Sequence, residues 1–120
     1  MLSLPASVRV YLCVPPTDMR KSFDGLYAVT QQVFEREPLD GHLFLFLNKR
    51  RDRIKILWWD RDGLAIFAKR LESGTYQLPS DLSETSGVEI DATQLAMLLG
   101  GIDVRSAQRR KRYSRAPVTS

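Results

Sequence analysis

The first feature of this sequence that could have a chemical role is a run of basic side chains. Five of the seven residues from Lys49 to Lys55 are basic, and Asp52 is the one acid among them. Basic side chains on a hairpin connection can contact phosphate oxygens, and a two-stranded ribbon fits the major groove of DNA. An ordinary solvated hairpin tip has a similar composition, so that interpretation stays open. The candidate nucleic-acid contacts here are Lys49, Arg50, Arg51, Arg53 and Lys55.

A second basic pair, Arg20 and Lys21, stands where a helix is expected to begin. The helix dipole disfavours cations at that position. The misfit favours an anion in front of them, either a phosphate or an acidic partner. The alternative is that the neighbouring Asp18 neutralises them.

The third concentration of charge is at the end of the chain. Residues 101–120 contain six basic side chains and one acidic side chain, whereas the remaining residues contain twelve basic and thirteen acidic ones. Basic arms at chain ends commonly contact nucleic acid, although a solvated tail has the same composition. The candidate contacts in this tail are Arg109, Arg110, Lys111, Arg112 and Arg115.

The adjacent tryptophans Trp58 and Trp59 are candidates for stacking on a base or for anchoring a protein partner. Neighbouring residues on a strand point to opposite faces, so one tryptophan is expected in the core while the other is available for contact. Burial of both is the alternative, because large aromatic side chains are usually core residues.

The sequence gives little support for catalytic activity. A metal-dependent nuclease would need convergent carboxylates, but turn and cap chemistry explains the available acids more simply. These acids are Asp18, Asp24, Asp52, Asp60 and Asp62. His42 is interpreted as a turn or packing residue, and Cys13, the single cysteine, as a small buried hydrophobe. We expect no enzymatic activity, no metal and no cofactor.

The elements that position these residues predict an α+β fold. We expect one domain over residues 1–105 and a flexible basic tail over 106–120. Three strands, 43–47, 54–59 and 64–71, are predicted to form an antiparallel meander, with the Asp-Gly turn before Leu64 as a strong hairpin signal. Apolar residues on both faces of the meander require a cover on each side. The whole central sheet is expected to be antiparallel, with about four to six strands.

Two main helices are expected to supply that cover. The first follows a strand at 8–14, is capped by Thr17 or Asp18, and carries an apolar stripe between Phe23 and Phe34. Gly25 within it suggests close packing of another backbone. The second begins after Asp91, with Gln94 in a capping-box position. Short strands are expected at 75–78 and 88–90. The chain has 120 residues, of which 43% are hydrophobic, and it shows neither a membrane-spanning run nor an export-type beginning. A cytoplasmic globular protein is therefore expected.

Several motifs resemble those of one known family. They are the segments 16–21, 23–26, 41–44, 52–60, 62–64, 69–72 and 95–103, of which Asp52-Arg53-Ile54-Lys55-Ile56-Leu57-Trp58-Trp59-Asp60 is the most specific. In order and spacing they resemble the TnpB-like accessory protein of the insertion sequence 66 family, over about Val8 to Arg105.

The resemblance implies a non-enzymatic role in transposition of a bacterial insertion element, beside a separate and larger transposase. The expected partners are DNA at the ends of the element, the transposase and other proteins of the same element, with no membrane, and oligomer formation stays open. The expected location is the bacterial cytoplasm, on the nucleoid. An adaptor that binds the transposase without touching DNA is the main alternative, and a nuclease is the lesser one.

Overall fold

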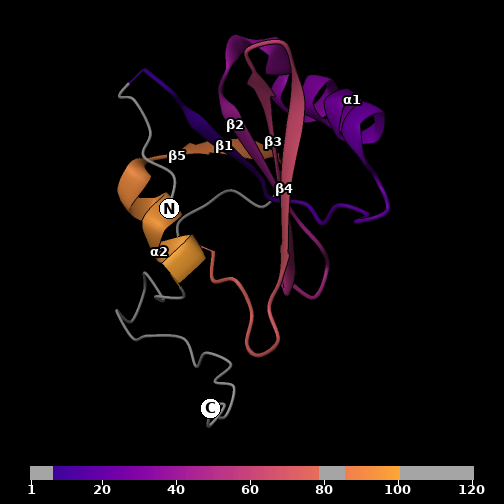
Figure 1. Cartoon of the computed structure of the whole chain (residues 1–120). Coiled ribbons are helices and arrows are strands. Elements are labelled where there is room, and N and C mark those ends of the chain that lie inside the picture. Colours follow the sequence, from indigo (N-terminus) through magenta and orange to yellow (C-terminus); the bar gives the residue numbers. More distant parts are fainter. Residues whose placement is uncertain (1–6, 79–85, 101–120) are drawn as a thin grey trace, which may run out of the picture.

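One mixed sheet of five strands organises the protein (Figure 1). The structure is a computed structural model that describes residues 7–78 and 86–100. The strand order is β4-β3-β2-β1-β5. In chain order the elements are β1 (Val10–Cys13), α1 (Phe23–Phe34), a short 3-10 turn (Pro38–Asp40), β2 (Leu43–Leu47), β3 (Arg53–Asp60), β4 (Gly63–Arg70), β5 (Gly87–Ile90) and α2 (Ala92–Gly100). The α+β class, the two helices and the antiparallel meander β2-β3-β4 are confirmed. The predicted basic tail lies outside the described residues.

The first two strands are parallel, which the sequence analysis did not anticipate. Val10 of β1 lies beside Leu43 of β2, and Cys13 lies beside Phe46. Parallel neighbours need a crossover connection, which the 12-residue helix α1 supplies. The expectation of a wholly antiparallel sheet is therefore wrong at this pair, and the carboxyl ends of β1 and β2 lie at the same edge of the sheet.

Strand β2 divides the core into two layers. All five of its residues are buried. Leu43, Leu45 and Leu47 enter one cluster with Ile54 and Ile56 of β3. The phenylalanines of β2 enter the other cluster with Leu57. Because successive side chains of a strand alternate in direction, the run Leu-Phe-Leu-Phe-Leu sends leucine to one face and phenylalanine to the other.

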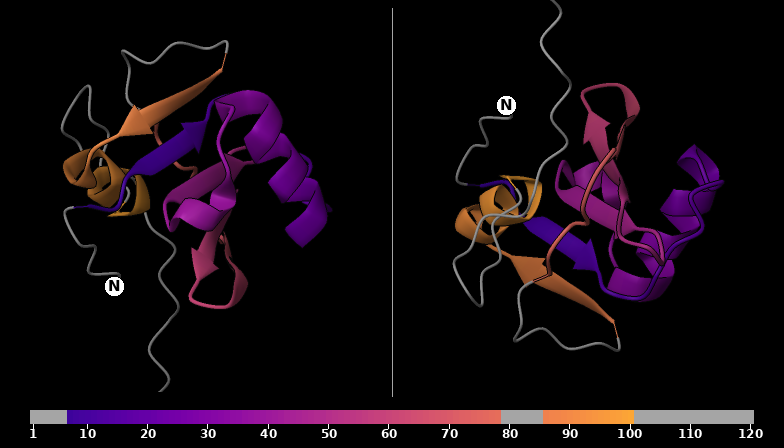
Figure 2. Two further views of the ribbon diagram at one scale, coloured as in Figure 1. Left: turned by 90° about the horizontal axis from the view of Figure 1, so that it is seen from above. Right: turned by 90° about the horizontal axis from the view of Figure 1, so that it is seen from below.

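The two helices cover opposite faces of this sheet, as Figure 2 shows from above and below. Leu26 of α1 joins the phenylalanine cluster, whereas Leu95 and Leu98 of α2 join the leucine cluster. The predicted capping box at the start of α2 is present. The Gln94 backbone N–H donates to Asp91 Oδ1 at 2.7 Å, and the Asp91 N–H donates to Gln94 Oε1 at 2.9 Å.

Helix α1 begins later than the sequence analysis predicted. Its N-cap is Ser22, which makes no side-chain capping bond, so the expected cap at Thr17 or Asp18 is wrong. The buried hydroxyl of Thr17 instead donates to Cys13 Sγ at 3.8 Å. Only Leu26 and Thr30 of α1 are fully buried, and Phe23 at its first turn is 46% exposed.

Three smaller predictions also need correction. A Cβ at Gly25 would meet the Lys21 side chain at 3.1 Å, so the close neighbour is an aliphatic stem and not another backbone. Residues 75–78 form no strand. In the β3–β4 hairpin the residue with positive φ is Arg61, at 60°, rather than Gly63.

His42 has the packing role that its sequence position suggested. Its Nδ1 accepts the Arg9 backbone N–H at 3.0 Å. Its ring meets Tyr11 edge-on, with 5.9 Å between the ring centroids.

Candidate nucleic-acid interface

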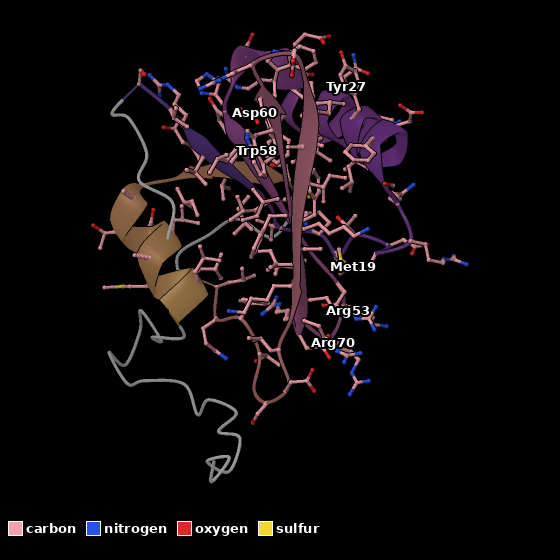
Figure 3. All side chains as sticks on the ribbon, in the orientation of Figure 1. Met19, Tyr27, Arg53, Trp58, Asp60 and Arg70 are labelled. Carbon is pink, nitrogen blue, oxygen red and sulfur yellow. The ribbon has the colours of Figure 1, made fainter. Side chains whose placement is uncertain are left out.

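The two ends of strand β3 carry different chemistry. Figure 3 places Arg53 and Arg70 at one end, with Met19 on the same side, and Asp60 at the other end. The end with Arg53 is also the edge where the parallel strands β1 and β2 terminate. In sheets with parallel strands, ligands commonly bind outside the carboxyl ends of those strands.

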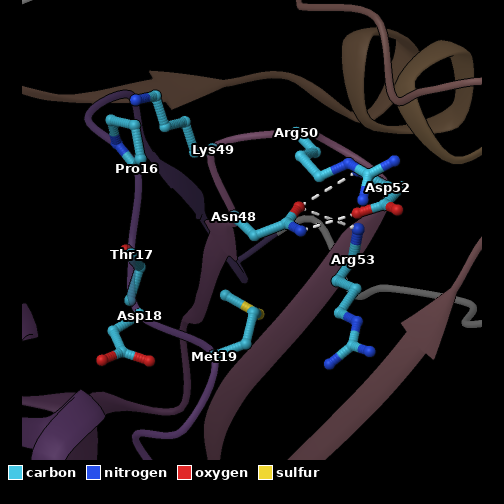
Figure 4. A pocket seen from close by; sticks show the side chains of 9 residues that line it. All are labelled: Pro16, Thr17, Asp18, Met19, Asn48, Lys49, Arg50, Asp52 and Arg53. Carbon is cyan, nitrogen blue, oxygen red and sulfur yellow. Dashed lines mark hydrogen bonds between the residues drawn. The ribbon is translucent and has the colours of Figure 1, made fainter.

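A hollow of about 450 Å³ lies at this edge (Figure 4). One wall follows β1 and the other is the connection between β2 and β3. The lining residues are Pro16, Thr17, Asp18, Met19, Asn48, Lys49, Arg50, Asp52 and Arg53. Three of these side chains are basic and two are acidic, so the hollow combines a cationic rim with carboxylate acceptors.

Asn48 holds the β2–β3 connection in shape. Its Oδ1 accepts the backbone N–H groups of Asp52 and Arg53, each at 3.0 Å, and its Nδ2 donates to Asp52 Oδ1 at 2.6 Å. The Asn48 carbonyl also accepts the Arg51 N–H at 3.0 Å. Asparagine side chains that bond nearby backbone replace regular turn bonds. The basic residues therefore project from a defined backbone.

The segment after β4 braces the same connection from outside. The Leu71 N–H donates to the Asp52 carbonyl at 2.7 Å, and the Tyr76 N–H donates to the Arg51 carbonyl at 2.7 Å. Arg51 has a φ of 60°, a left-handed conformation that is unfavourable for a residue with a side chain. The surrounding bonds fix this conformation, so the connection is held on both sides.

The opposite wall is fixed to the sheet and to itself. The Thr17 N–H donates to the Leu47 carbonyl at 2.8 Å. Asp18 binds the Arg20 guanidinium through Nε at 3.1 Å and Nη2 at 2.7 Å, and it also accepts the Arg20 N–H. The side-chain and backbone bonds from Arg20 lower the pKa of Asp18 from 3.8 to about 2. Asp18 and Arg20 therefore form an ion pair.

Asp52 offsets part of the basic charge at the rim. The Asn48 amide lowers the pKa of its carboxyl, and the charges of Arg50 and Arg53 act in the same direction. Lys49, Arg50 and Arg51 are exposed, and none of them makes an ion pair within residues 7–78 and 86–100. They are the cations of the connection that are open to an external anion.

Lys55 and Lys21 have structural contacts that the sequence did not reveal. The half-buried Lys55 donates its Nζ to the Lys21 carbonyl at 2.7 Å, which ties β3 to the segment before α1. Lys21 itself is exposed, and its stem lies against Gly25. Because α1 starts at Phe23, neither Arg20 nor Lys21 lies within the helix.

The tryptophans lie on opposite faces of β3, and both are half-buried. Trp58 packs against the leucine cluster, and Trp59 donates its Nε1 to the Arg61 carbonyl at 3.1 Å. The exposed large aromatics among the described residues are instead Phe23, at 46%, and Phe67, at 43%. The sequence analysis singled out neither of them for contact with a partner.

The five candidate acids do not gather at one site, although Asp18 and Asp52 line the same hollow. Asp52 lies at one end of β3, and Asp60 and Asp62 lie at the other. Asp24 belongs to α1. Within the described ranges, no three His, Cys, Asp or Glu side chains are grouped so that they could hold a metal ion. Neither described helix has the length and apolar character needed to cross a bilayer.

Two parts of the site were missed from the sequence. The wall from Pro16 to Met19 meets the basic connection only because β1 and β2 are parallel, and the helix-length segment between two apolar runs was the available signal. Asn48 was grouped with a polar connection, although an asparagine at a turn commonly bonds nearby backbone through its side chain.

Comparison with known proteins gives a consistent family match. The model of the family described as "IS66 Orf2 like protein" matches residues 8–109. The uncharacterized protein y4hO of Sinorhizobium fredii (strain NBRC 101917 / NGR234) is 39% identical over 108 residues, which cover 90% of this chain and 92% of that protein. The uncharacterized protein y4jC of the same strain is 26% identical over 110 residues and covers 92% of each chain. No solved structure matches the chain.

Proposed function

Because the chain belongs to the IS66 Orf2-like family of transposition-associated accessory proteins, we propose that it binds DNA phosphates with the rim of the hollow described above. It does so beside the separate transposase of the same element, in the bacterial cytoplasm and on the nucleoid. The observation that carries the proposal is the braced connection from Asn48 to Arg53, which presents exposed cations on a fixed backbone.

A fixed connection has a physical advantage over a free chain of the same charge. Any cation that neutralises a phosphate releases counterions and adds affinity. Side chains in register with base edges are also needed for sequence preference. Lys49 and Arg50 line the hollow, and Asn48 fixes the backbone that carries them. The connection is therefore the described surface best suited to distinguish the ends of the element from other DNA.

The test is a salt series of DNA-binding measurements by fluorescence anisotropy. The double substitution Lys49→Gln/Arg50→Gln should make the logarithmic salt slope less negative by about 1.8, at about 0.9 per phosphate contact. The matched control, Arg36→Gln/Arg61→Gln, removes two exposed charges that lie outside the hollow and should leave the slope nearly unchanged. Equal effects of the two variants, or a slope near zero for the parent protein, would remove the support for this interface.

The basic tail, outside the described residues, is proposed to supply bulk affinity. If the tail and the connection each neutralise about four phosphates, the slope of the intact protein is about −7, and deleting the residues after Gln108 roughly halves it. Replacing Arg50 and Arg51 with alanine should instead flatten any preference for the ends of the element. An unchanged slope after the deletion would contradict this division of roles.

A second candidate function is a protein adaptor that binds the transposase without touching DNA. The exposed Phe67 on the outermost described strand favours it, since aromatic residues anchor protein interfaces. The proteins of the element should be purified together and separately, and each sample scored for complex formation and for retention on DNA. If the chain neither enters a transposase complex nor binds DNA, both candidate functions are wrong.

We propose further that the chain has no chemistry of its own. The support is that Asp18 and Asp52, the two acids at the hollow, are joined there by no third His, Cys, Asp or Glu ligand among the described residues. The protein should be incubated with DNA of the element's ends and Mg²⁺ or Mn²⁺. Cleavage that disappears in Asp60→Ala or Asp62→Ala would establish the nuclease alternative instead.

A further inference from the structure

Strand β4 combines three features that bear on association. It is the terminal strand of the sheet, so its outer edge has no hydrogen-bonded strand beside it among the described residues. It is eight residues long and contains no proline. It also carries Phe67, which is 43% exposed. Long strand edges of this kind are templates for pairing with another strand.

The charges on β4 and its hairpin differ in net sign between the two ends. Asp60, Arg61 and Asp62 at the turn together carry a net charge of −1, whereas Lys69 and Arg70 at the end of the strand carry +2, reduced to +1 by the following Glu72, and all of these side chains are exposed. Figure 3 shows Asp60 and Arg70 at opposite ends of the ribbon. An antiparallel copy of the same strand reverses this order, so acidic ends face basic ends. A parallel copy would place like charges together, which is unfavourable.

We propose that the partner of this edge is a second copy of the chain, joined by antiparallel pairing of β4 with β4 across a two-fold axis. A two-fold interface uses the same patch on both subunits, and the charge order of β4 is complementary to itself in that sense. Two five-stranded sheets then become one continuous sheet. The proposal does not depend on DNA binding.

The hairpin geometry limits the registers that this pairing can adopt. Asp60 pairs with Gly63 at the turn, so the odd-numbered residues of β4 direct their backbone groups toward β3 and the even-numbered ones direct them outward. Outward groups of the two copies must meet each other. The register that also brings the exposed aromatics together places Phe67 opposite Phe67, as a cross-strand aromatic pair.

In this register Arg70 lies opposite Leu64 of the partner copy. Asp62 of the partner copy is then the diagonal neighbour of Arg70, within reach of a long side chain. Arg70 already makes an exposed ion pair with Glu72 at 3.1 Å, and pairs of this kind are weak enough to exchange partners. Each interface therefore contains one central aromatic pair and two symmetry-related charge pairs.

The test is sedimentation equilibrium of the full chain over a wide range of concentration. The parent protein should show a reversible monomer–dimer equilibrium, and Phe67→Lys should raise its dissociation constant about tenfold or more. The control is Phe23→Lys, because Phe23 is equally exposed but lies at the start of α1. It should leave the equilibrium unchanged. Circular dichroism of both variants checks that they fold.

A charge exchange tests the register directly. Arg70→Asp alone and Asp62→Arg alone should each weaken the dimer, because each places like charges at the diagonal contact. The double variant Asp62→Arg/Arg70→Asp should restore most of the affinity, because it rebuilds both pairs with the signs reversed. Failure of the double variant to recover would overturn the pairing.

Three further outcomes would also overturn the proposal. The first is a chain that stays monomeric at the highest concentration measured. The second is a dimer that is indifferent to Phe67→Lys, because the contact then lies elsewhere. The third is a monomer whose complex with the transposase is lost in Phe67→Lys, because the β4 edge then belongs to a different protein.

Discussion

The two connections that flank β3 have one backbone feature in common but are held by different contacts. Each contains an arginine with a φ of 60°, Arg51 in one and Arg61 in the other. The connection before β3 is basic, half-enclosed by the wall from Pro16 to Met19, and held by Asn48. The connection after β3 is a two-residue tip, Arg61 and Asp62, between the paired residues Asp60 and Gly63. A left-handed arginine is therefore compatible with a braced site as well as with a plain turn.

The difference lies in what holds each backbone. At Arg51 the carbonyl accepts a bond from Tyr76, a residue far along the chain, and Asn48 closes the turn from within. At Arg61 the carbonyl accepts a bond from Trp59 Nε1, which belongs to a residue only two positions away. Local contacts suffice to reverse a chain, but a surface that must present cations in a fixed arrangement benefits from long-range bracing.

The largest expected effect comes from removing the brace. Asn48→Ala deletes two accepted N–H bonds and one donated bond, and it leaves the half-buried Asp52 without its amide partner. The free energy of unfolding should fall by about 2–3 kcal/mol, at about 1 kcal/mol for each bond lost. Urea denaturation measures this change. The control at the other connection, Asp62→Ala, should cost less than about 0.5 kcal/mol, as exposed substitutions usually do. Similar losses of unfolding free energy at both positions would show that the two connections do not differ in how firmly they are held.

A moderate effect is expected from glycine at the two left-handed positions. Arg51→Gly and Arg61→Gly each relieve an unfavourable φ but increase the freedom of the unfolded chain, for a net gain of about 0.5–1 kcal/mol. Thermal unfolding should show the same gain for both. DNA affinity should fall only for Arg51→Gly, because only that arginine belongs to the proposed interface. A loss of affinity in Arg61→Gly would place the interface elsewhere.

The smallest effect concerns the pH response of Asp18 in the wall of the hollow. Its folded-state pKa is lowered from 3.8 to about 2 by the bonds from Arg20. Folding therefore favours the ionised form. That contribution is fully present above pH 3.8 and is lost as the pH falls through about 2. Carboxyl carbon NMR should show Asp18 titrating near pH 2 in the parent protein.

Arg20→Gln is the matching variant, because it removes the guanidinium while the Arg20 position keeps its backbone N–H. The midpoint for Asp18 should move most of the way back toward 3.8. A midpoint near 3.8 in the parent protein would mean that the Asp18–Arg20 pair does not persist in solution, and that this wall is less fixed than the braced connection.

The sequence predicted the parts of this protein that depend on short-range patterns. The apolar runs predicted the strands of the meander, and the apolar residues on both of its faces correctly predicted a cover on each side. The capping box of Asp91 and Gln94 marked the start of α2. Periodicity, turn chemistry and caps act within a few residues, so they can be recognised without knowing what packs against them.

Only the tertiary structure decided which of these elements meet. Helix α1 starts at Phe23, later than predicted, because Asp18 binds Arg20 and Thr17 bonds to Cys13, and both contacts compete with a helix cap. The candidate site required β1 and β2 to be parallel, since this alone brings residues 16–19 to the connection at 48–53. Strand direction is set by the packing of α1 and by the pairing of distant strands, whose free energy no local pattern records.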